Sequence, residues 1–413
     1  MSSSKPVGQE TETLNVMLLT HSFWPESSPP QRRWKSFTRA IAASGHRVSV
    51  VTPRAGTPRK PASQGGTATD AGVRIIRYPG FGLAAGLAGK TIRSLGQAVA
   101  SIPASLRQGR QDIVIATVPA LSMLFSGFAV SRLLRAQFVV DLRDPWPDLF
   151  RDSNILRSRI LEPVAIRAML CLLRRADLVI TVTEGLARNA RSQGMLNVAT
   201  VPNGVDLAKC PVPLKREQAP AAPDRLQVLY LGNVGLSQGL DLLVRAAAQL
   251  SGSIHVRIVG DGNDRDRLRQ LAVDLEAPVE FLDPVRGEQT LEMYRWADTV
   301  VVSLRPDWPS FNHTVPSKLY ELLALDLHVT GLVRGEAAAI IDNAKAGQLV
   351  GQDLASLTSH LRQLHRNRDS LRVAGNGPQW IAEHANLAEL GSAYARHLEA
   401  LGKPATSKRR GRW

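Results

Sequence analysis

Cysteine and aromatic residues are scarce in this 413-residue chain. The two cysteines, Cys171 and Cys210, lie far apart in the sequence, and Phe, Trp and Tyr together make up 5% of it. A disulfide scaffold or a cysteine-based zinc site needs paired cysteines, so both are excluded and a reducing compartment is expected. Stacking of single-stranded bases needs aromatic residues among basic ones, and no such stripe is present. No nucleic-acid partner is therefore expected.

The chain also lacks a long apolar run of the kind that crosses a membrane. Its longest uncharged stretch, residues 113–131, contains Pro119 and Gly127 and opens with the β-branched segment IVIATV. A transmembrane helix needs about 20 consecutive apolar residues, so a buried strand followed by a buried helix explains this stretch better. Residues 1–13 carry no apolar signal region and are expected to form a flexible tail.

Acidic residues are also scarce relative to basic ones, but only in the first half of the chain. Residues 1–206 contain 26 Lys/Arg and 13 Asp/Glu, a balance of +13, whereas residues 207–413 have a balance of +2. The first half is therefore suited to meet anions. Nucleic acid, an acidic membrane surface and a phosphorylated substrate all have the required charge.

What the chain does contain is a regular alternation of short apolar runs and amphipathic helical stretches. Because the runs are nearly continuous in apolar residues, the pattern predicts an α/β fold with two doubly wound parallel sheets. The runs are LNVMLLT, HRVSVVTP, VRIIRYP, DIVIATV, QFVVDLRD, ADLVITVT and VATVPN, followed by LQVLYLGN, IHVRIVGDG, VEFLD, TVVVSL and LHVTGLV.

The two series are separated by a proline-rich segment, residues 202–225, which has little periodicity. We therefore expect a first domain over residues 14–205, a linker over 206–225 and a second domain over 226–400. The final helix of the second domain is able to return to the first domain, and residues 401–413 form a basic tail. Ligands of such sheets bind at the carboxyl ends of the strands, so a site is expected between the domains.

Two strand–turn–helix segments of the second domain carry glycines where a ligand could approach the backbone. Gly232 follows one strand and Gly260 the next, and the helices behind them offer amide groups to an anion. Glycines also make ordinary turns, so this signal alone leaves both interpretations open. Asp264 and Asp266 resemble a metal-binding Asp-x-Asp, but they fall in a first helical turn that favours acidic residues. No metal is expected there.

The segment TVPSKLYELL, which begins at Thr314, places a lysine and a glutamate at a helix start. Pro316 suits the first helical position, and the amide groups of Ser317 and Lys318 then face a bound phosphate. Glu321, one turn further, can accept both hydroxyls of a ribose. The alternative is a solvated Lys–Glu pair worth about 0.2–0.5 kcal/mol. The position after a strand of the second series favours the functional interpretation.

In the first domain, VVDLRDPWP ends a strand, so Asp141 and Asp144 are expected at the site, where a carboxylate can orient or deprotonate an acceptor hydroxyl. A structural Asp–Arg pair with Arg143 or a neighbouring arginine explains the same residues equally well. His21, after the first strand, is a third catalytic candidate. Arg32 and Arg33, at a helix start, either bind acceptor phosphate or are simply solvated.

Taken together, these segments resemble a known family. PNGVD at the domain junction, YLGNVGLSQGLDLLVRAA, VGDGNDRDRLRQLA, VPSKLYELLALDLHV, DLRDPWPDLF and SGHRVSVVTP are similar, in this order, to glycosyltransferase family 4 enzymes of the GT-B fold. The branch most resembled contains the fucosamine transferase-like enzymes of bacterial surface-polysaccharide synthesis. The likeness covers about residues 14–400.

The resemblance implies that the second domain binds a nucleotide diphosphate sugar and the first binds the acceptor. It assigns the donor ribose to Glu321, and it implies anomeric retention. The chain departs from the family where His313 replaces a donor glutamate, and where Asn233 and Gln238 replace an arginine and a lysine that neutralise the pyrophosphate. Lys318 and Arg305 are then the candidates for the missing positive charge.

The sequence therefore predicts an enzyme of the hexosyltransferase type with no essential metal or cofactor. A lipid-linked acceptor is expected, and with it a cytoplasmic location on the inner face of the membrane, docked on anionic lipid. A soluble small-molecule acceptor and a nucleotide-sugar epimerase of the same fold are the alternatives. Less favoured are a non-catalytic binding protein and a P-loop nucleotidase. The P-loop pattern in residues 84–91, AAGLAGKT, does not directly follow a strand.

Overall fold

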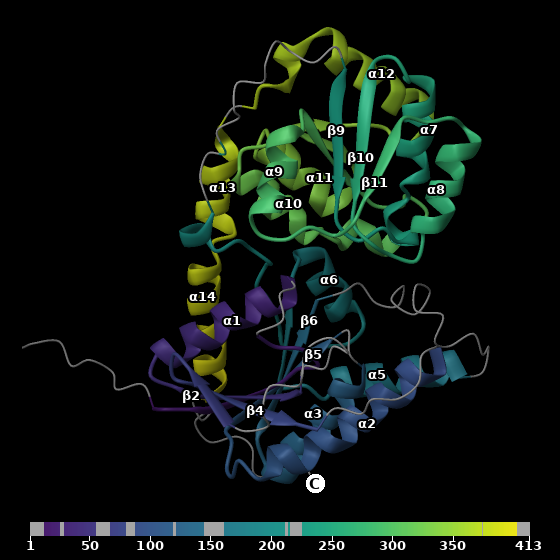
Figure 1. The fold of residues 1–413 in the computed structure, drawn as a ribbon. Helices are drawn as coiled ribbons and strands as arrows, with labels where there is room; N and C mark the ends of the chain where they lie inside the picture. Colours follow the sequence, from purple (N-terminus) through teal and green to yellow (C-terminus); the bar gives the residue numbers. More distant parts are fainter. Residues whose placement is uncertain are drawn as a thin grey trace, which may run out of the picture.

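The computed structural model describes residues 12–24, 29–54, 67–79, 87–118, 121–143, 161–210, 214, 225–373 and 375–402. They form two lobes, one above the other, each built around a twisted sheet (Figure 1). The chain passes from the lower lobe to the upper one and returns through its last helices.

The first domain contains an eight-stranded sheet in the order β3-β4-β2-β1-β5-β6-β7-β8. All neighbouring pairs are parallel except β3 with β4. Its strands are β1 (Asn15–Leu19), β2 (Arg47–Pro53), β3 (Thr67–Asp70), β4 (Val73–Tyr78), β5 (Ile113–Val118), β6 (Gln137–Leu142), β7 (Leu178–Thr181) and β8 (Val198–Thr200).

The second domain contains a six-stranded parallel sheet in the order β11-β10-β9-β12-β13-β14. In both sheets the chain starts in the middle, runs to one edge, and then returns to continue toward the other, as in a Rossmann fold. The strands are β9 (Leu226–Leu231), β10 (Ile254–Val259), β11 (Val279–Leu282), β12 (Thr299–Ser303), β13 (Val329–Leu332) and β14 (Gly347–Leu349).

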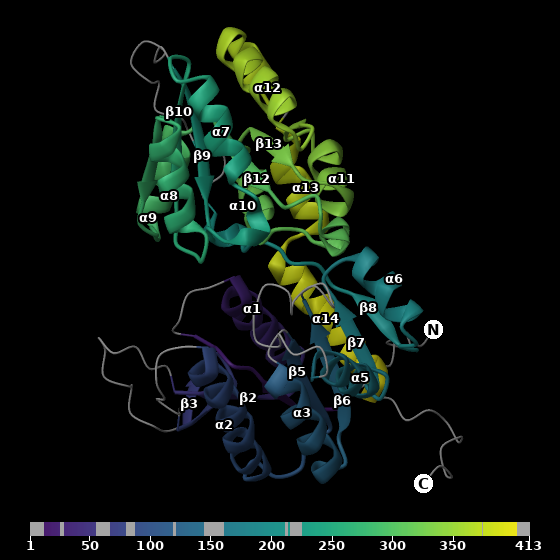
Figure 2. The same cartoon turned by 90° about the vertical axis from the view of Figure 1, so that its right-hand side faces the viewer.

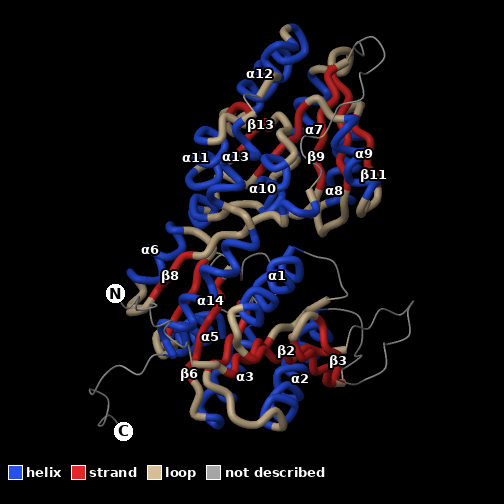
Figure 3. Tube along the Cα trace, turned by 90° about the vertical axis from the view of Figure 1, so that its left-hand side faces the viewer, coloured by secondary structure: helices blue, strands red, loops and turns tan. Residues whose placement is uncertain are grey.

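Helices cover both faces of each sheet (Figure 3). In the first domain they are α1 (Pro29–Ala43), α2 (Leu87–Leu106), α3 (Leu121–Leu134), α5 (Leu161–Leu173) and α6 (Glu184–Ser192). In the second they are α7 (Asp241–Gln249), α8 (Arg265–Asp274), α9 (Glu288–Trp296), α10 (Ser317–Ala324), α11 (Gly335–Asn343), α12 (Leu354–Arg366) and α13 (Asn376–His384), with 3-10 turns η1 (Leu207–Lys209), η2 (Leu236–Gln238), η3 (Pro309–His313) and η4 (Arg368–Leu371).

The last helix, α14 (Leu387–Gly402), belongs to the core of the first domain. Its Tyr394 packs against Trp34 and Phe37 of α1, with ring centroids 5.5 and 5.2 Å apart. Figures 1 and 2 show α14 beside α1 in the lower lobe, although α13, which precedes it, lies on the second domain. Alternate residues of β1 contribute to the opposite face, where Met17 and Leu19 meet the helices α2 and α3.

The structure confirms the two doubly wound sheets and adds what the sequence patterns omitted. The short edge strands β3 and β14 were not predicted, because their sequences, TATD and GQL, contain no run of apolar residues. Residues 113–118 form β5 and residues 121–134 form α3, so the uncharged stretch over 113–131 is a strand and a helix, as expected. Pro316 precedes the first residue of α10 instead of occupying it. Residues 84–86 of the P-loop pattern lie outside the described residues, and Leu87 already begins α2.

Candidate active site

The carboxyl end of β9 is the point of the second sheet at which the strand order reverses, which is where doubly wound sheets bind ligands. Gly232 follows β9 with φ +147°. A Cβ at this position would come within 2.5 Å of the Lys318 amino nitrogen. The positive φ favours glycine here, and the missing side chain leaves the space that the lysine amino group occupies.

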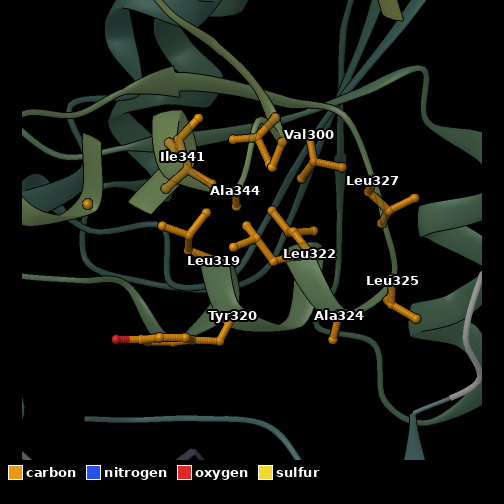
Figure 4. Close-up of a cluster of buried hydrophobic side chains, with 14 of the residues drawn as sticks. Val300, Leu319, Tyr320, Leu322, Ala324, Leu325, Leu327, Ile341 and Ala344 are labelled. Atoms are coloured by element: carbon orange, nitrogen blue, oxygen red, sulfur yellow. The ribbon is translucent and has the colours of Figure 1, made fainter. Parts of the chain in front are cut away.

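Helix α10 carries that lysine, and its position is set by packing on one side. Leu319, Leu322 and Leu323 are fully buried in the core between α10, α11 and β12 (Figure 4). Pro316, with φ −59° and ψ +128°, ends the extended segment, and the amide of Leu319 is bonded to the Pro316 carbonyl at 2.9 Å. The amides of Ser317 and Lys318 belong to the first turn, whose donors have no partner within a helix. They can therefore serve a ligand.

Lys318 is unusual because its ammonium group is buried without a hydrogen-bond partner. The nitrogen lies 3.7 Å from the centre of the Tyr230 ring, in a cation–π contact. Burial lowers the pKa of this amine to about 7, against the opposing effect of Glu321. A cation in such a place lacks the partner that would compensate for lost hydration, and an anionic ligand would supply it.

Glu321 lies one turn further along α10, and its side chain is 28% exposed. The Tyr294 phenol lies beside it: burial and then the charge of Glu321 raise the pKa of this phenol well above its usual value. Tyr294 therefore keeps its proton at neutral pH. Arg32 approaches Glu321 from the first domain, with its guanidinium 3.9 Å from the carboxylate. Of the two arginines predicted to meet an acceptor, Arg32 is thus the one that reaches this site.

The side chains of Asn233 and Gln238 are hydrogen-bonded to each other in the loop after β9. The Asn233 amide donates to the Gln238 side-chain oxygen at 3.2 Å, and the Gly235 amide donates to the same oxygen at 3.0 Å. The adjoining loop after β10 packs closely against it, since a Cβ on Gly260 would fall 1.8 Å from the Gly232 carbonyl oxygen. These residues shape the loop with neutral groups, and they supply no positive charge.

Arg305, the second candidate for the missing charge, is already paired. Its guanidinium donates to both carboxylate oxygens of Asp307 at 2.9 and 2.7 Å. Together with Trp308, Phe311 and Arg334, Arg305 lines a small pocket at the carboxyl ends of β12 and β13. Arg305 therefore meets a ligand only in competition with Asp307, whereas Lys318 has no such competitor.

His313 lies where the second domain contacts α6 of the first. Its carbonyl accepts a hydrogen bond from the Thr183 hydroxyl at 2.7 Å, and its ring packs on Gly185. The Gly185 amide donates to Glu336, at the start of α11. His313 therefore joins the two domains in this arrangement, and the contacts around it do not identify what binds the transferred sugar.

Asp141 and Arg33 differ most from expectation. Asp141 is fully buried, 3.4 Å from Arg33 and 3.7 Å from Arg143. Arg33 is 2% exposed and donates to the carbonyls of Val201, at 2.9 Å, and Pro202. The alternative of a structural Asp–Arg pair describes this geometry, and a guanidinium enclosed in this way cannot meet an acceptor.

The remaining candidates are His21 and Asp144. His21 is exposed just beyond β1, at the carboxyl edge of the first sheet. Asp144 lies outside the described residues.

Sequence patterns missed Tyr230 and Tyr294, although each is a tyrosine in an otherwise aliphatic or polar segment. They also missed that Asp264 is buried and accepts two hydrogen bonds from Arg267, at 2.6 and 2.7 Å. Asp266 lies in the first turn of α8, as expected. Within the described residues, no cluster of His, Cys, Asp and Glu is arranged to hold a metal ion.

Two family models match the chain, one in each domain. Residues 30–204 match a glycosyl transferase 4-like domain, and residues 225–367 match glycosyl transferases group 1. No curated protein matches the chain. Between them, the two family matches span well over half of its length.

Solved structures show the same architecture at low sequence identity. Sucrose-phosphate synthase from Thermosynechococcus elongatus has a TM-score of 0.74 and 18% identity, over 94% of this chain and 98% of that one. Anabaena HepE, in complex with UDP and glucose, has a TM-score of 0.68 and 15% identity, over 94% and 100%. WaaG, a glycosyltransferase of lipopolysaccharide biosynthesis, has a TM-score of 0.60 and 15% identity, over 92% and 99%.

The predicted GT-B fold is confirmed, and the chain belongs to the GT-B glycosyltransferases, with a glycosyl transferase 4-like first domain and a group 1 second domain. The particular branch and the acceptor are not decided by these matches. None of the helices in the described part of the chain is both long and apolar enough to cross a membrane.

Proposed function

We propose that the protein transfers a sugar from a nucleotide diphosphate sugar to a hydroxyl group of a lipid-linked acceptor, in the synthesis of a cell-surface polysaccharide or glycoconjugate. The observation that supports the donor site is the buried, unpartnered ammonium of Lys318 beside Gly232, next to the carboxylate of Glu321 on the same helix. The Lys318 ammonium would neutralise the diphosphate, and the Glu321 carboxylate would accept hydrogen bonds from the ribose hydroxyls.

The donor class draws further support from a structural neighbour. Anabaena HepE has been crystallised with UDP-glucose, and its fold matches this chain over nearly its whole length. In the proposed donor complex, the amides of Ser317 and Lys318 add their dipoles to the lysine charge. Gly232 and Gly260 leave room for the phosphates at the strand ends, while Asn233, Gln238 and His313 shape the surrounding loops.

For the acceptor, the proposed catalytic group is His21, an exposed side chain at the carboxyl edge of the first sheet, and Asp144 remains a candidate from the sequence. Arg32, whose side chain is 59% exposed, is proposed to meet a phosphate of the acceptor. The reaction is proposed to proceed with retention and without a metal. A fucosamine-type sugar is proposed on the resemblance alone.

A soluble acceptor is the second candidate. It is favoured by the neighbour sucrose-phosphate synthase, whose name denotes a small phosphorylated product. The two candidates differ in where the product is found, because a lipid-linked product partitions into organic solvent and a sugar phosphate stays in water.

A thermal-shift screen against nucleotide diphosphate sugars tests the donor proposal. A ligand at one hundred times its dissociation constant stabilises the folded state by about 2.7 kcal/mol, which is readily detected. The donor found in this way, carrying a radiolabelled sugar, is then incubated with the protein and a membrane lipid extract. Label in the organic phase supports the lipid-linked acceptor. Label in the aqueous phase favours the soluble one, and the absence of any stabilising nucleotide sugar would overturn the donor site.

A further inference from the structure

One side of the first domain exposes large apolar side chains that its core does not use. They lie on α2, α3 and α5, which lie next to one another in the lower lobe (Figure 1). The exposed residues are Leu95 (59% exposed), Val99 (69%) and Leu106 on α2, Phe125 and Leu133 on α3, and Val164 on α5. We refer to these six residues and the helical surface between them as the α2–α3–α5 face.

The pattern on α2 shows that the exposure follows from the sequence. Leu95, Val99 and Leu106 recur at helical spacing along one side, whereas Ala98, Ser101 and Ser105 are buried on the other. The two serine hydroxyls donate to backbone carbonyls of the same helix, at 2.7 Å each. Helix α2 thus buries small side chains and exposes large apolar ones. An ordinary surface helix has the opposite distribution, with its large apolar side chains buried.

Charge on the same helices is predominantly positive. The sequences of α2, α3 and α5 contain one acidic residue, Glu162. Arg132, Arg167 and Arg174 are exposed on these helices or directly after them. Arg132 and Arg174 donate to the backbone carbonyls of Arg175 and Gln193, at 3.3 and 2.7 Å, and in the described part of the chain none of the three forms a salt bridge. Arg132 lies over the Phe128 ring, 5.0 Å from its centre, so that its charge accompanies the apolar surface.

We propose that the α2–α3–α5 face docks on an anionic lipid bilayer, with its apolar side chains in the interfacial layer and its arginines at the headgroup phosphates. Apolar residues combined with an excess of basic ones are the chemistry that such a surface selects. A second copy of the chain fits less well, because a two-fold interface would bring the same arginines together. In the second domain, by contrast, the exposed apolar residues Leu236, Val273 and Leu349 lie on three separate elements.

The experiment is co-sedimentation of the full chain with sucrose-loaded vesicles. The full chain is needed because α14 completes the core of the first domain. Wild-type protein is expected to bind vesicles of phosphatidylglycerol and phosphatidylcholine, to bind pure phosphatidylcholine at least tenfold more weakly, and to be released at 1 M salt, where screening shortens to about 3 Å. Leu95→Ser with Val99→Ser should weaken partitioning by about tenfold or more, and Arg167→Gln by about fivefold.

Matched variants separate docking from general surface effects. Val273→Ser, at a second-domain valine that is 70% exposed, is the control for Val99, and Arg362→Gln on α12 is the control for Arg167. Both controls should bind like the wild type. Unchanged melting temperature and donor affinity would show that the α2 variant is folded. Equal binding by all variants overturns the proposal. So does a wild type that ignores anionic vesicles, and self-association on a sizing column would then assign the face to a second copy.

This surface is independent of the reaction proposed above. Vesicle binding can fail while transfer to a soluble acceptor persists, and the donor site can fail while vesicle binding persists. The two outcomes are therefore distinguishable in separate assays.

Discussion

Each domain buries a cation near the junction, and the two cations differ in the partners that the protein gives them. Arg33 of the first domain has the Asp141 carboxylate and two backbone carbonyls as partners. Lys318 of the second has no hydrogen-bond partner; its amino group lies on the face of the Tyr230 ring, and the charge of Glu321 acts on it without a hydrogen bond. A buried charge with all its partners inside the protein contributes to structure, whereas one without partners is held ready for a ligand. The comparison assigns the first to stability and the second to binding.

The largest effect is expected from breaking the buried pair of the first domain. Asp141→Asn leaves the Arg33 and Arg143 charges without their carboxylate, which should destabilise the fold by about 3–5 kcal/mol. The double variant Asp141→Leu with Arg33→Met should lose less, because it leaves fewer uncompensated charges. Urea unfolding measures both. A stable but inactive Asp141→Asn protein would instead support a catalytic role for this carboxylate.

Removal of the unpartnered cation should act on binding. Lys318→Met is expected to weaken the nucleoside diphosphate by about 1.5–3 kcal/mol, the value of hydrogen bonds to charged groups, and to leave the bare nucleoside almost unchanged. Calorimetry with both ligands measures this difference. Lys345→Met, at an exposed lysine of the second domain, is the matched control. Equal losses for diphosphate and nucleoside would show that Lys318 does not contact phosphate.

The pH dependence of binding sharpens the same assignment. Burial holds the pKa of Lys318 at about 7, and a bound diphosphate would raise it. Donor binding should then take up a proton above pH 7, so affinity should be constant below about pH 6 and fall as the pH rises from 7 to 9. Calorimetry in two buffers of different ionisation enthalpy detects the proton. Lys318→Met should abolish both effects.

In the absence of donor, the stability of the folded protein should depend on pH with the opposite sign to donor affinity. Between pH 7 and 10.5 the unfolded chain binds more protons at Lys318 than the folded chain does. The contribution of this residue to stability therefore rises with pH over that window.

Glu321→Gln retains the shape of the side chain and removes its charge. The loss of charged hydrogen bonds to the ribose should lower nucleotide affinity by about tenfold. Because the nucleoside carries the ribose, Glu321→Gln should weaken nucleoside and nucleoside diphosphate alike, unlike Lys318→Met. Unaltered affinity in a folded variant would remove Glu321 from the donor site.

The smallest effect is expected at Arg32, the neighbour of Arg33. Its exposed contact with Glu321, at 3.9 Å, is of the kind worth about 0–1 kcal/mol. Arg32→Gln should therefore alter stability by less than about 1 kcal/mol, and any effect should vanish at high salt. Urea unfolding at two salt concentrations measures it. A loss comparable to that of Asp141→Asn would contradict the distinction between the two arginines.

Local patterns were sufficient to predict helix α10 of the second domain, because its signals lie close together in the sequence. In PSKLYELL, the proline fixes the helix start and leucines at helical spacing fix the buried side, so Lys318 and Glu321 follow. The first domain offered no such local signal. Asp141 and Arg33 are 108 positions apart, and nothing in either segment indicates that they meet. The sequence therefore left the structural and catalytic interpretations of Asp141 equally open.

Periodicity and composition determined the two α/β domains, the region of their junction and the helix that carries the donor candidates, because strands and helices are encoded by spacings of two to four residues. Tertiary structure decided which charged groups are satisfied. Burial gathers partners from distant segments, and so it separates Arg33, enclosed by Asp141 and two carbonyls, from Lys318, whose amino group is enclosed without a hydrogen-bond partner. Tertiary structure also decided the α2–α3–α5 face. Leucines recur at the same helical spacing whether they are buried or exposed, and only the packing of α2 on the sheet shows which side of the helix is exposed to solvent.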